Sequence, residues 1–170
     1  MKYLVCSDIH GSLGVFRKIL ECEKDSGIDA VIVTGDLELS PEILRDQIEE
    51  ILPGIDYKSI HMVRGNCDEY SAASALPLEL ILDDSGHKIF ITHGHRQGIP
   101  RVNAMYIAAS REGCDIALFG HSHTYTDQYE DDVRFLNPGA VVKGYGKPSS
   151  YMILNIAGGR ENVEAEKKTI

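Results

Sequence analysis

Five short apolar runs in the sequence each end in polar residues of the kinds that bind metal ions. Each run has the length and the residue types of a buried β-strand, and histidine, aspartate or asparagine follows it within two positions. In α/β proteins the loops beyond the carboxyl ends of the strands face one crevice, so we expect these side chains to converge. The clusters are Asp8-Ile9-His10, Gly35-Asp36, Gly65-Asn66, His93-Gly94-His95 and Gly120-His121-Ser122-His123.

The remaining pattern predicts one α/β domain over residues 1–170. Helices are expected over 12–26, 41–52 and 100–112. Strands are expected over 2–7, 29–34, 59–63, 78–83, 88–92, 115–119, 124–130, 133–136, 150–156 and 161–167. This alternation followed by consecutive strands indicates an α/β core extended by antiparallel strands. So many strands in 170 residues favour two stacked sheets flanked by helices over one open sheet.

The spacing within the clusters predicts how the side chains reach one site. Asp8 and His10 are two residues apart, as are His121 and His123, and in extended backbone this spacing places both side chains on the same side. A glycine precedes the polar residue in three clusters, which permits a tight backbone there. His61 lies in a strand and His87 in a hairpin turn, so we expect neither in the cluster.

The recurrence of these clusters, rather than any one of them, predicts a metal site. One histidine or one Gly-Asp pair after a strand is most often a turn. Two carboxylates, one amide and four imidazoles exceed the ligands of a single catalytic zinc and suit two divalent ions that share Asp36. Mixed nitrogen and oxygen ligation favours Mn, Fe, Co, Ni or Zn over Mg or Ca, with Mn preferred here. The candidate ligands are Asp8, His10, Asp36, Asn66, His93, His121 and His123.

Composition restricts the partners. The net charge is −9 without a cluster of Lys and Arg, which disfavours long nucleic acids and anionic membranes. No apolar stretch approaches the roughly 20 residues of a membrane helix, and we expect no signal peptide. The four cysteines form no CxxC pair, so we expect reduced thiols and a cytoplasmic location. The antiparallel C-terminal strands offer an edge on which a homo-oligomer could pair.

The combined motifs resemble those of the calcineurin-like metallophosphoesterases. Gly65-Asn66-Cys67-Asp68-Glu69, His93-Gly94-His95 and Asn137-Pro138-Gly139-Ala140 look most like its small bacterial and archaeal phosphodiesterase branch. The resemblance implies a four-layer αββα sandwich and hydrolysis of small phosphodiesters by in-line attack of a metal-bridging hydroxide. It also implies one ion on Asp8, His10, Asp36 and His123, and another on Asp36, Asn66, His93 and His121.

Further residues have less certain roles under this resemblance. Asn66 could donate its amide N–H to the phosphate, and Arg64 and Arg96 either contact a phosphate or are solvated flanks. His95 either contacts the substrate, as a hydrogen-bonding group or an acid, or orients a neighbouring ligand. Many larger relatives have a histidine that protonates the leaving group where this chain has Cys67. We favour Cys67 as a small packed residue over a catalytic thiol, and therefore expect a preference for good leaving groups such as aryl oxides.

Two other functions compete with the phosphodiesterase. A non-catalytic interaction scaffold on the same fold is one, because Pro138-Gly139 and Gly120-His121-x-His123 also resemble the retromer subunit. That scaffold departs from the catalytic pattern at the bridging aspartate and the metal-binding asparagine. Asp36 and Asn66 are both present here, which favours the enzyme. A nuclease is a weaker third possibility, restricted to short or cyclic nucleotides by the absence of a basic groove.

Overall fold

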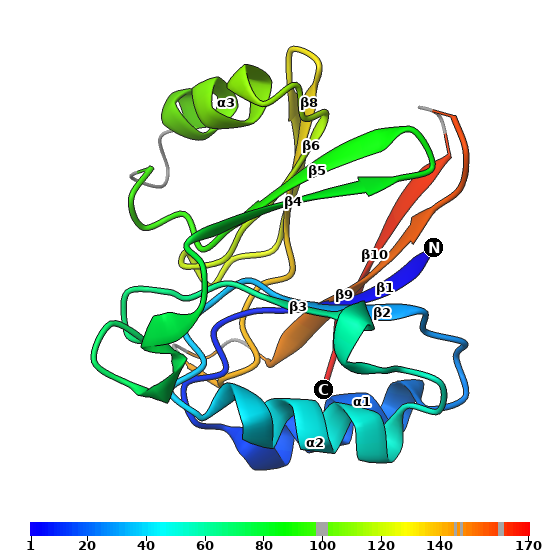
Figure 1. The fold of residues 1–170 in the computed structure, drawn as a ribbon, viewed down its shortest axis with the longest axis vertical. Helices are drawn as coiled ribbons and strands as arrows, with labels where there is room; N and C mark the ends of the chain where they lie inside the picture. Colours follow the sequence, from blue (N-terminus) through cyan, green and yellow to red (C-terminus); the bar gives the residue numbers. More distant parts are fainter. Residues whose placement is uncertain (98–101, 145, 147, 160–161) are drawn as a thin grey trace.

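Two five-stranded β-sheets stack face to face, and helices cover their outer faces (Figure 1). The computed structural model describes residues 1–97, 102–144, 146, 148–159 and 162–170. In the first sheet the strands are ordered β10-β9-β1-β2-β3. Their bounds are β1 Lys2–Cys6, β2 Ala30–Val33, β3 Ile60–Met62, β9 Ser150–Ile156 and β10 Val163–Thr169. The strands β1, β2 and β3 are parallel, whereas β9 and β10 pair antiparallel.

The second sheet is also mixed, with the order β4-β5-β6-β8-β7. Its strands are β4 Glu79–Asp84, β5 His87–Thr92, β6 Ile116–Leu118, β7 Thr126–Glu130 and β8 Val133–Asn137. The central strands β5, β6 and β8 are parallel, and the outer strands β4 and β7 are antiparallel to their neighbours. Parallel strands therefore lie next to one another in both sheets, and the polar clusters follow five of them.

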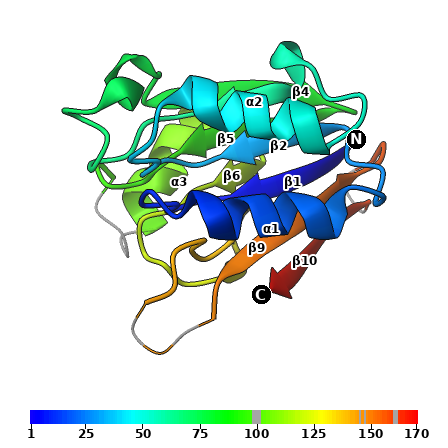
Figure 2. The ribbon, with the colours of Figure 1, turned by 90° about the horizontal axis from the view of Figure 1, so that it is seen from below.

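The helices form the two outer layers. The helices α1 (Leu13–Glu23) and α2 (Pro41–Ile51) lie side by side over the first sheet (Figure 2), and α3 (Val102–Arg111) lies over the second. Short 3-10 helices η1 (Tyr57–Ser59) and η2 (Ala72–Ala75) occur in the connections around β3. Among the described residues no helix combines the length and the hydropathy needed to span a bilayer.

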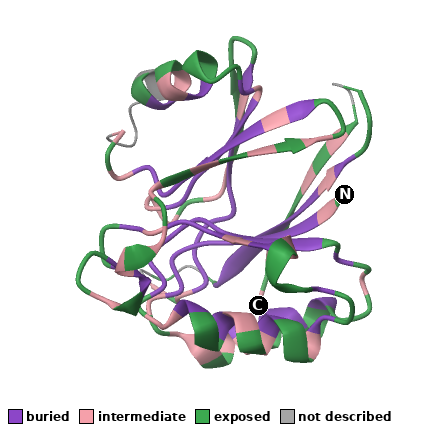
Figure 3. Ribbon diagram, viewed as in Figure 1, coloured by how far each residue is buried: buried purple, intermediate pink, exposed green. Residues whose placement is uncertain are grey.

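The structure has three hydrophobic cores, and side chains that alternate along the central strands belong to two of them. In β1, Leu4 and Cys6 pack with α1 and α2, whereas Tyr3 and Val5 face the second sheet. A strand buried on both faces reads as a continuous apolar run, which explains why β1 and β2 have few polar residues. Phe90 and Phe135 belong to a third core beneath α3. Figure 3 shows the same pattern, with buried strands inside and helices exposed on their outer sides.

The predicted four-layer αββα class is confirmed, and the element boundaries shift by a few residues. The helix expected over 12–26 ends at Glu23, and the strand expected over 124–130 begins at Thr126. The first residues of the expected helix 100–112 and strand 161–167 lie outside the described residues. The prediction that His87 lies in the hairpin turn is wrong, because His87 is buried and is the first residue of β5. Ser85 and Gly86 form the turn, and both have positive φ.

Candidate metal centre

The polar clusters meet at one end of the stacked sheets. Three of them follow β1, β2 and β3 in the first sheet, and two follow β5 and β6 in the second. Backbone hydrogen bonds continue past the strands: the Asp8 N–H donates to the Gly35 carbonyl at 3.0 Å, and the Gly120 N–H donates to the His93 carbonyl at 3.2 Å. The site is therefore built across the two sheets, at the carboxyl ends of strands from both.

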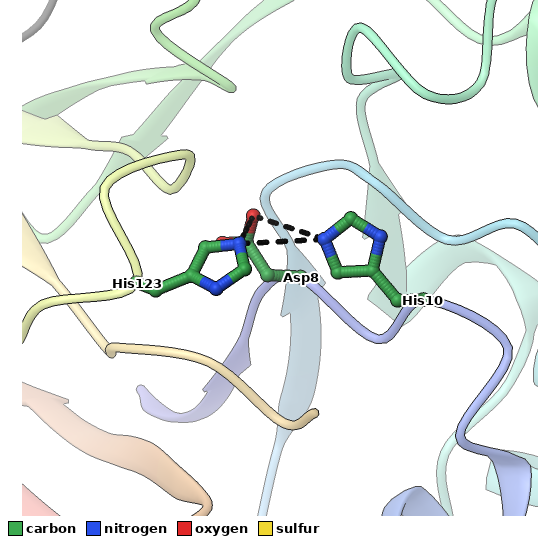
Figure 4. A group of neighbouring side chains, drawn as sticks. All are labelled: Asp8, His10 and His123. Carbon is green, nitrogen blue, oxygen red and sulfur yellow. Dashed lines mark hydrogen bonds and ion pairs between the residues drawn. The ribbon is translucent and has the colours of Figure 1, made fainter. Parts of the chain in front are cut away.

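Asp8, His10 and His123 form one side of the site (Figure 4). The His123 Nε2 lies 3.1 Å from Asp8 Oδ1 and 3.3 Å from His10 Nε2. The His10 Nε2 lies 3.9 Å from the same Asp8 oxygen. One ligand atom from each residue thus points at a common point, although the residues come from loops more than a hundred positions apart.

Asp36, His93 and His121 form the other side, and Asp36 joins the two sides. The Asp36 Oδ2 lies 3.2 Å from His93 Nε2 and 3.7 Å from His10 Nε2. One carboxylate oxygen therefore lies close to a candidate ligand from each side. The His93 and His121 rings meet edge to face with their centroids 5.2 Å apart. All ligand atoms of this group lie within 4.8 Å of one another.

In four candidate ligands, one polar side-chain atom contacts a neighbouring residue and the other points toward the centre of the site. Asp8 Oδ2 accepts hydrogen bonds from the Ser7 hydroxyl and the His121 N–H, and Asp36 Oδ1 accepts from the Cys67 N–H. His93 Nδ1 donates to the Thr34 carbonyl at 2.7 Å, and His10 Nδ1 lies 3.2 Å from Glu38. Such partners fix the ring orientation and direct Nε2 toward the centre, as at metal sites.

Two of the inward atoms are buried without a hydrogen-bond partner. Asp8 Oδ1 and His93 Nε2 are both inaccessible to solvent, and neither forms a hydrogen bond. Their nearest polar neighbours are other candidate ligands: Asp8 Oδ1 lies 3.1 Å from His123 Nε2, and His93 Nε2 lies 3.2 Å from Asp36 Oδ2. Buried polar atoms are almost always hydrogen-bonded, and a bound metal ion is one explanation of those that are not. Nitrogen and oxygen donors at these positions suit a transition-metal ion. The residues present therefore fit divalent metal ions.

The loops hold these residues in backbone conformations that L-amino acids rarely adopt. Six of the eight described non-glycine residues with positive φ belong to the site: Asp8, His10, Asp36, Glu38, His121 and His123. The prediction that extended backbone aligns Asp8 with His10, and His121 with His123, is wrong. All four residues have positive φ, the left-handed region, so the backbone is not extended at either pair. Each such residue costs roughly 1–3 kcal/mol, a cost typical of functional sites.

Two glycines are required by close approach. A Cβ at Gly65 would lie 2.0 Å from Asp36 Oδ1, and a Cβ at Gly120 would lie 1.9 Å from Ser7 Oγ and 2.9 Å from Asp8 Oδ2. Neither glycine has positive φ, so the space of the missing side chain matters here rather than backbone freedom. The prediction of a tight backbone at the glycines is confirmed at Gly35, where φ is 101°; at Gly65 and Gly120 the requirement is steric.

Asn66 and Cys67 lie at the exposed rim. The Asn66 amide donates to Cys67 Sγ at 3.3 Å, and the thiol lies within 4.8 Å of a ligand atom of His10 and of Asp36. The expectation that Cys67 is a packed residue is wrong, since the residue is exposed. Its backbone N–H donates to Asp36 Oδ1, and its thiol accepts from Asn66. Partial burial and the neighbouring Asp36 raise the pKa of the thiol to about 12.

Arg64, Asn66, His95 and Arg96 line one cavity beside the cluster. The Arg64 guanidinium donates to the Ser74 carbonyl at 2.8 Å, so it also braces the loop around η2. The His95 ring lies 5.5 Å from that of His93 and 6.3 Å from that of His121. The structure thus brings together every residue predicted to contact substrate, and leaves His61 and His87 outside this cavity and the three ligand groups.

The carboxylates of Asp8 and Asp36 shift the pKa values of the neighbouring histidines. Burial opposes ionisation of Asp36, but His93 and the Cys67 N–H outweigh it and lower the Asp36 pKa. Burial likewise opposes protonation of His93, whereas Asp36 and Asp8 raise its pKa; Asp8 raises the pKa of His123. Burial and the proximity of His93 lower the pKa of His121.

Sequence reasoning missed the residues that support the ligands. Buried Asp68 accepts backbone N–H groups of Leu37, Glu38 and Gly65 at 2.8–3.2 Å and so ties the loops after β2 and β3 together. Asn137, which the sequence marks only as part of the motif Asn137-Pro138-Gly139-Ala140, donates to the Gly120 carbonyl and to Ser122 Oγ. The cluster pattern itself marks neither role, because both depend on contacts between distant loops.

Comparisons with known proteins agree with this geometry. A sequence model of the calcineurin-like phosphoesterase superfamily domain matches residues 1–159. Phosphodiesterase YfcE of Escherichia coli (strain K12) is 29% identical over 169 residues, covering 91% of this chain and 88% of that protein. The structure of a novel archaeal phosphodiesterase covers 100% of both chains with a TM-score of 0.76 at 23% identity.

A structure of Chaetomium thermophilum Vps29 is similar in fold as well. It covers 99% of this chain and 97% of its own, with a TM-score of 0.74 at 20% identity. The αββα architecture is thus shared by proteins described as phosphodiesterases and by Vps29, and the fold does not by itself decide the activity. The family match over residues 1–159, together with the loops described above, places this chain in the calcineurin-like phosphoesterase superfamily.

Proposed function

We propose that this protein is a phosphodiesterase that acts with two divalent metal ions, and that Mn²⁺ is the preferred ion. The observation that carries the proposal is the position of Asp36 Oδ2, 3.7 Å from His10 Nε2 and 3.2 Å from His93 Nε2. A single oxygen between two groups of ligands supports a shared carboxylate. We assign Asp8, His10, Asp36 and His123 to one ion, and Asp36, His93 and His121 to the other. Following the family resemblance, we also assign Asn66 to the second ion.

In the proposed reaction, water adds its oxygen to phosphorus, the bond to the leaving oxygen breaks, and a phosphomonoester and an alcohol form. Two divalent ions, when bound, supply Lewis acidity that lowers the pKa of a water and offsets the charge developing on the phosphate. The chain's own residues position the substrate. Asn66 at the rim offers an amide N–H to the phosphate, and His95 lies beside His93 and His121 with the cavity in front of it.

Cys67 limits the range of leaving groups. Its thiol, with a pKa of about 12, is a far weaker proton donor at neutral pH than an imidazolium would be. A general acid is typically worth ~10²–10⁴ in rate, so its absence matters most for poor leaving groups. We therefore expect aryl phosphodiesters to be hydrolysed well and alkyl monoesters poorly.

Hydrolysis of bis(p-nitrophenyl) phosphate with added Mn²⁺ tests the proposal. We expect turnover well above the metal-only background, abolished by a chelator and by Asp36→Asn. Bound metal without turnover would instead favour a non-catalytic scaffold, the alternative raised by the sequence resemblance to the retromer subunit. Metal content is therefore measured on the same samples.

Two further proposals concern the setting of the protein. The cysteines are all free, which suits a reducing compartment, and we place the protein in the cytoplasm. The strand β10 is the outermost strand of the first sheet, and its free edge is available for pairing with a second copy. Size measurement in solution tests the second of these.

A further inference from the structure

Two cavities open beside the candidate ligands, and their linings differ in chemistry. The larger, about 350 Å³, is lined by His121, Ser122, His123, Ala140, Val142, Gly144 and Pro148. The smaller, about 170 Å³, is lined by Arg64, Gly65, Asn66, Glu69, Leu78, His95 and Arg96. They share no described lining residue, yet the larger includes the candidate ligands His121 and His123 and the smaller includes Asn66. A phosphate held at the ligands would therefore have a separate cavity for each of its two substituents.

The smaller cavity is cationic. Arg64 and Arg96 line it against one carboxylate, that of Glu69. The hydrogen bond from Arg64 to the Ser74 carbonyl holds its guanidinium in place, while Arg96 is exposed. His95 adds a buried Nδ1 that has no hydrogen-bond partner. Guanidinium groups recognise carboxylate and phosphate through paired N–H donors.

The larger cavity has a different lining. Its described residues carry no formal charge at pH 7 apart from any on its two histidines, and Ala140, Val142 and Pro148 give it an apolar wall. Its size is within the range of small-molecule sites. An uncharged aryl or alkyl substituent suits this cavity better than an ionised one, because an ionised group would lose hydration there without a partner.

We infer that the substrate is an asymmetric phosphodiester with a second anionic group on one substituent. This inference rests on the proposed function. A simple diester carries one negative charge, which the metal ions would neutralise, so two arginines in the smaller cavity exceed its needs. The arginines bind a carboxylate or a phosphate on one substituent, and the uncharged substituent lies in the larger cavity.

A matched pair of substrates tests the inference. The first is p-nitrophenyl phenyl phosphate, and the second carries a carboxylate at the para position of the phenyl group; both release p-nitrophenolate. We expect kcat/KM to be roughly fivefold or more higher for the carboxylate, as an interaction of about 1 kcal/mol with a partly exposed guanidinium would give. The preference should shrink in 0.5 M salt, because salt screens exposed charges.

Variants assign this preference to the cavity. Arg96→Gln should bring the ratio of the two kcat/KM values close to one, Arg96→Lys should retain part of it, and Glu69→Gln should increase it. Arg111→Gln, at the end of α3, is the matched control and should leave the ratio unchanged. Arg96 is substituted rather than Arg64, because Arg64 also holds the loop around η2 and its substitution would alter that loop.

Binding provides a readout that does not depend on turnover. Titration calorimetry on the Mn²⁺-loaded protein should show tighter binding of 4-phosphonobenzoate than of phenylphosphonate, and Arg96→Gln should remove the difference. Hydrolysis of bis(p-nitrophenyl) phosphate without any preference for the carboxylate would overturn this inference and leave the proposed function intact. Failure to hydrolyse any of these diesters would overturn both.

Discussion

At the scale of single residues, the candidate ligands are held before any ion binds. Asp8 and Asp36 each have one oxygen bound to the protein and one turned inward, and His10 and His93 do the same with their ring nitrogens. Such preorganisation reduces the entropy that a bound ion must overcome, and strained backbone is part of its cost.

Substitution of Gly120 tests this preorganisation. We expect Gly120→Ala to displace Ser7 and Asp8, since the new Cβ would lie 1.9 Å from Ser7 Oγ, and to reduce bound metal and activity at least tenfold. Gly14 in α1 is the control, because nothing lies within 4 Å of a Cβ there. Gly14→Ala should stabilise the protein by about 0.5–1 kcal/mol through helix propensity. Normal metal content in Gly120→Ala would contradict the steric explanation.

The histidines predict how the metal-free protein responds to pH. The pKa of His93 is raised in the folded state by Asp36 and Asp8, against the effect of burial. A raised folded pKa contributes stability that is present below the unfolded value of about 6.5 and is lost as pH rises through the folded value. In a chelator, the contribution of His93 to the free energy of unfolding should therefore fall as pH rises above about 6.5, so the stability of His93→Asn should fall less with pH than that of the wild type. A steeper fall in the variant would contradict the assignment.

At the scale of elements, Asp68 couples the loops that follow β2 and β3. Its buried carboxylate accepts three backbone N–H groups, so truncation would leave three donors unpaired. We expect Asp68→Ala to destabilise the protein by about 3 kcal/mol in urea unfolding and to lower metal affinity. Exposed Asp56, which caps η1, is the control: Asp56→Ala should cost only about 1 kcal/mol. Equal losses for the two variants would contradict the role given to Asp68.

The elements were predicted from sequence more successfully than their assembly. Apolar runs such as those of β1 and β2 are continuous because both faces are buried, so strand position and ending could be read directly. The spatial order of strands, with β9 beside β1, depends on pairing between distant residues, such as Lys2 with Asn155, that no local pattern contains. The candidate ligands could be predicted because they directly follow predicted strands. Asp68 and Asn137 could not, because each forms hydrogen bonds with a loop that is distant in sequence.

At the scale of the whole molecule, the candidate ligands connect the two sheets. Asp8, His10 and Asp36 follow strands of the first sheet, and His93, His121 and His123 follow strands of the second. Ions at this centre would tie the sheets together at one end, while apolar side chains between them hold the remainder. Metal binding should therefore stabilise the whole fold and not only the loops.

Thermal unfolding measures this coupling. A ligand at a hundredfold excess over its dissociation constant stabilises the folded state by about 2.7 kcal/mol. For a chain of this size, Mn²⁺ should therefore raise the melting temperature by roughly 5–10 °C. Asp36→Asn should remove most of the increase, while Asp56→Asn should leave it unchanged. An equal increase in wild type and Asp36→Asn would place the stabilising ion elsewhere.

The most direct measurement is anomalous diffraction from a crystal soaked in Mn²⁺. The shared-carboxylate centre predicts two anomalous peaks roughly 3.5–4 Å apart, both within bonding distance of the Asp36 carboxylate. One peak should lie among Asp8, His10 and His123, and the other beside His93 and His121. A single peak, or two peaks of which only one contacts Asp36, would contradict it.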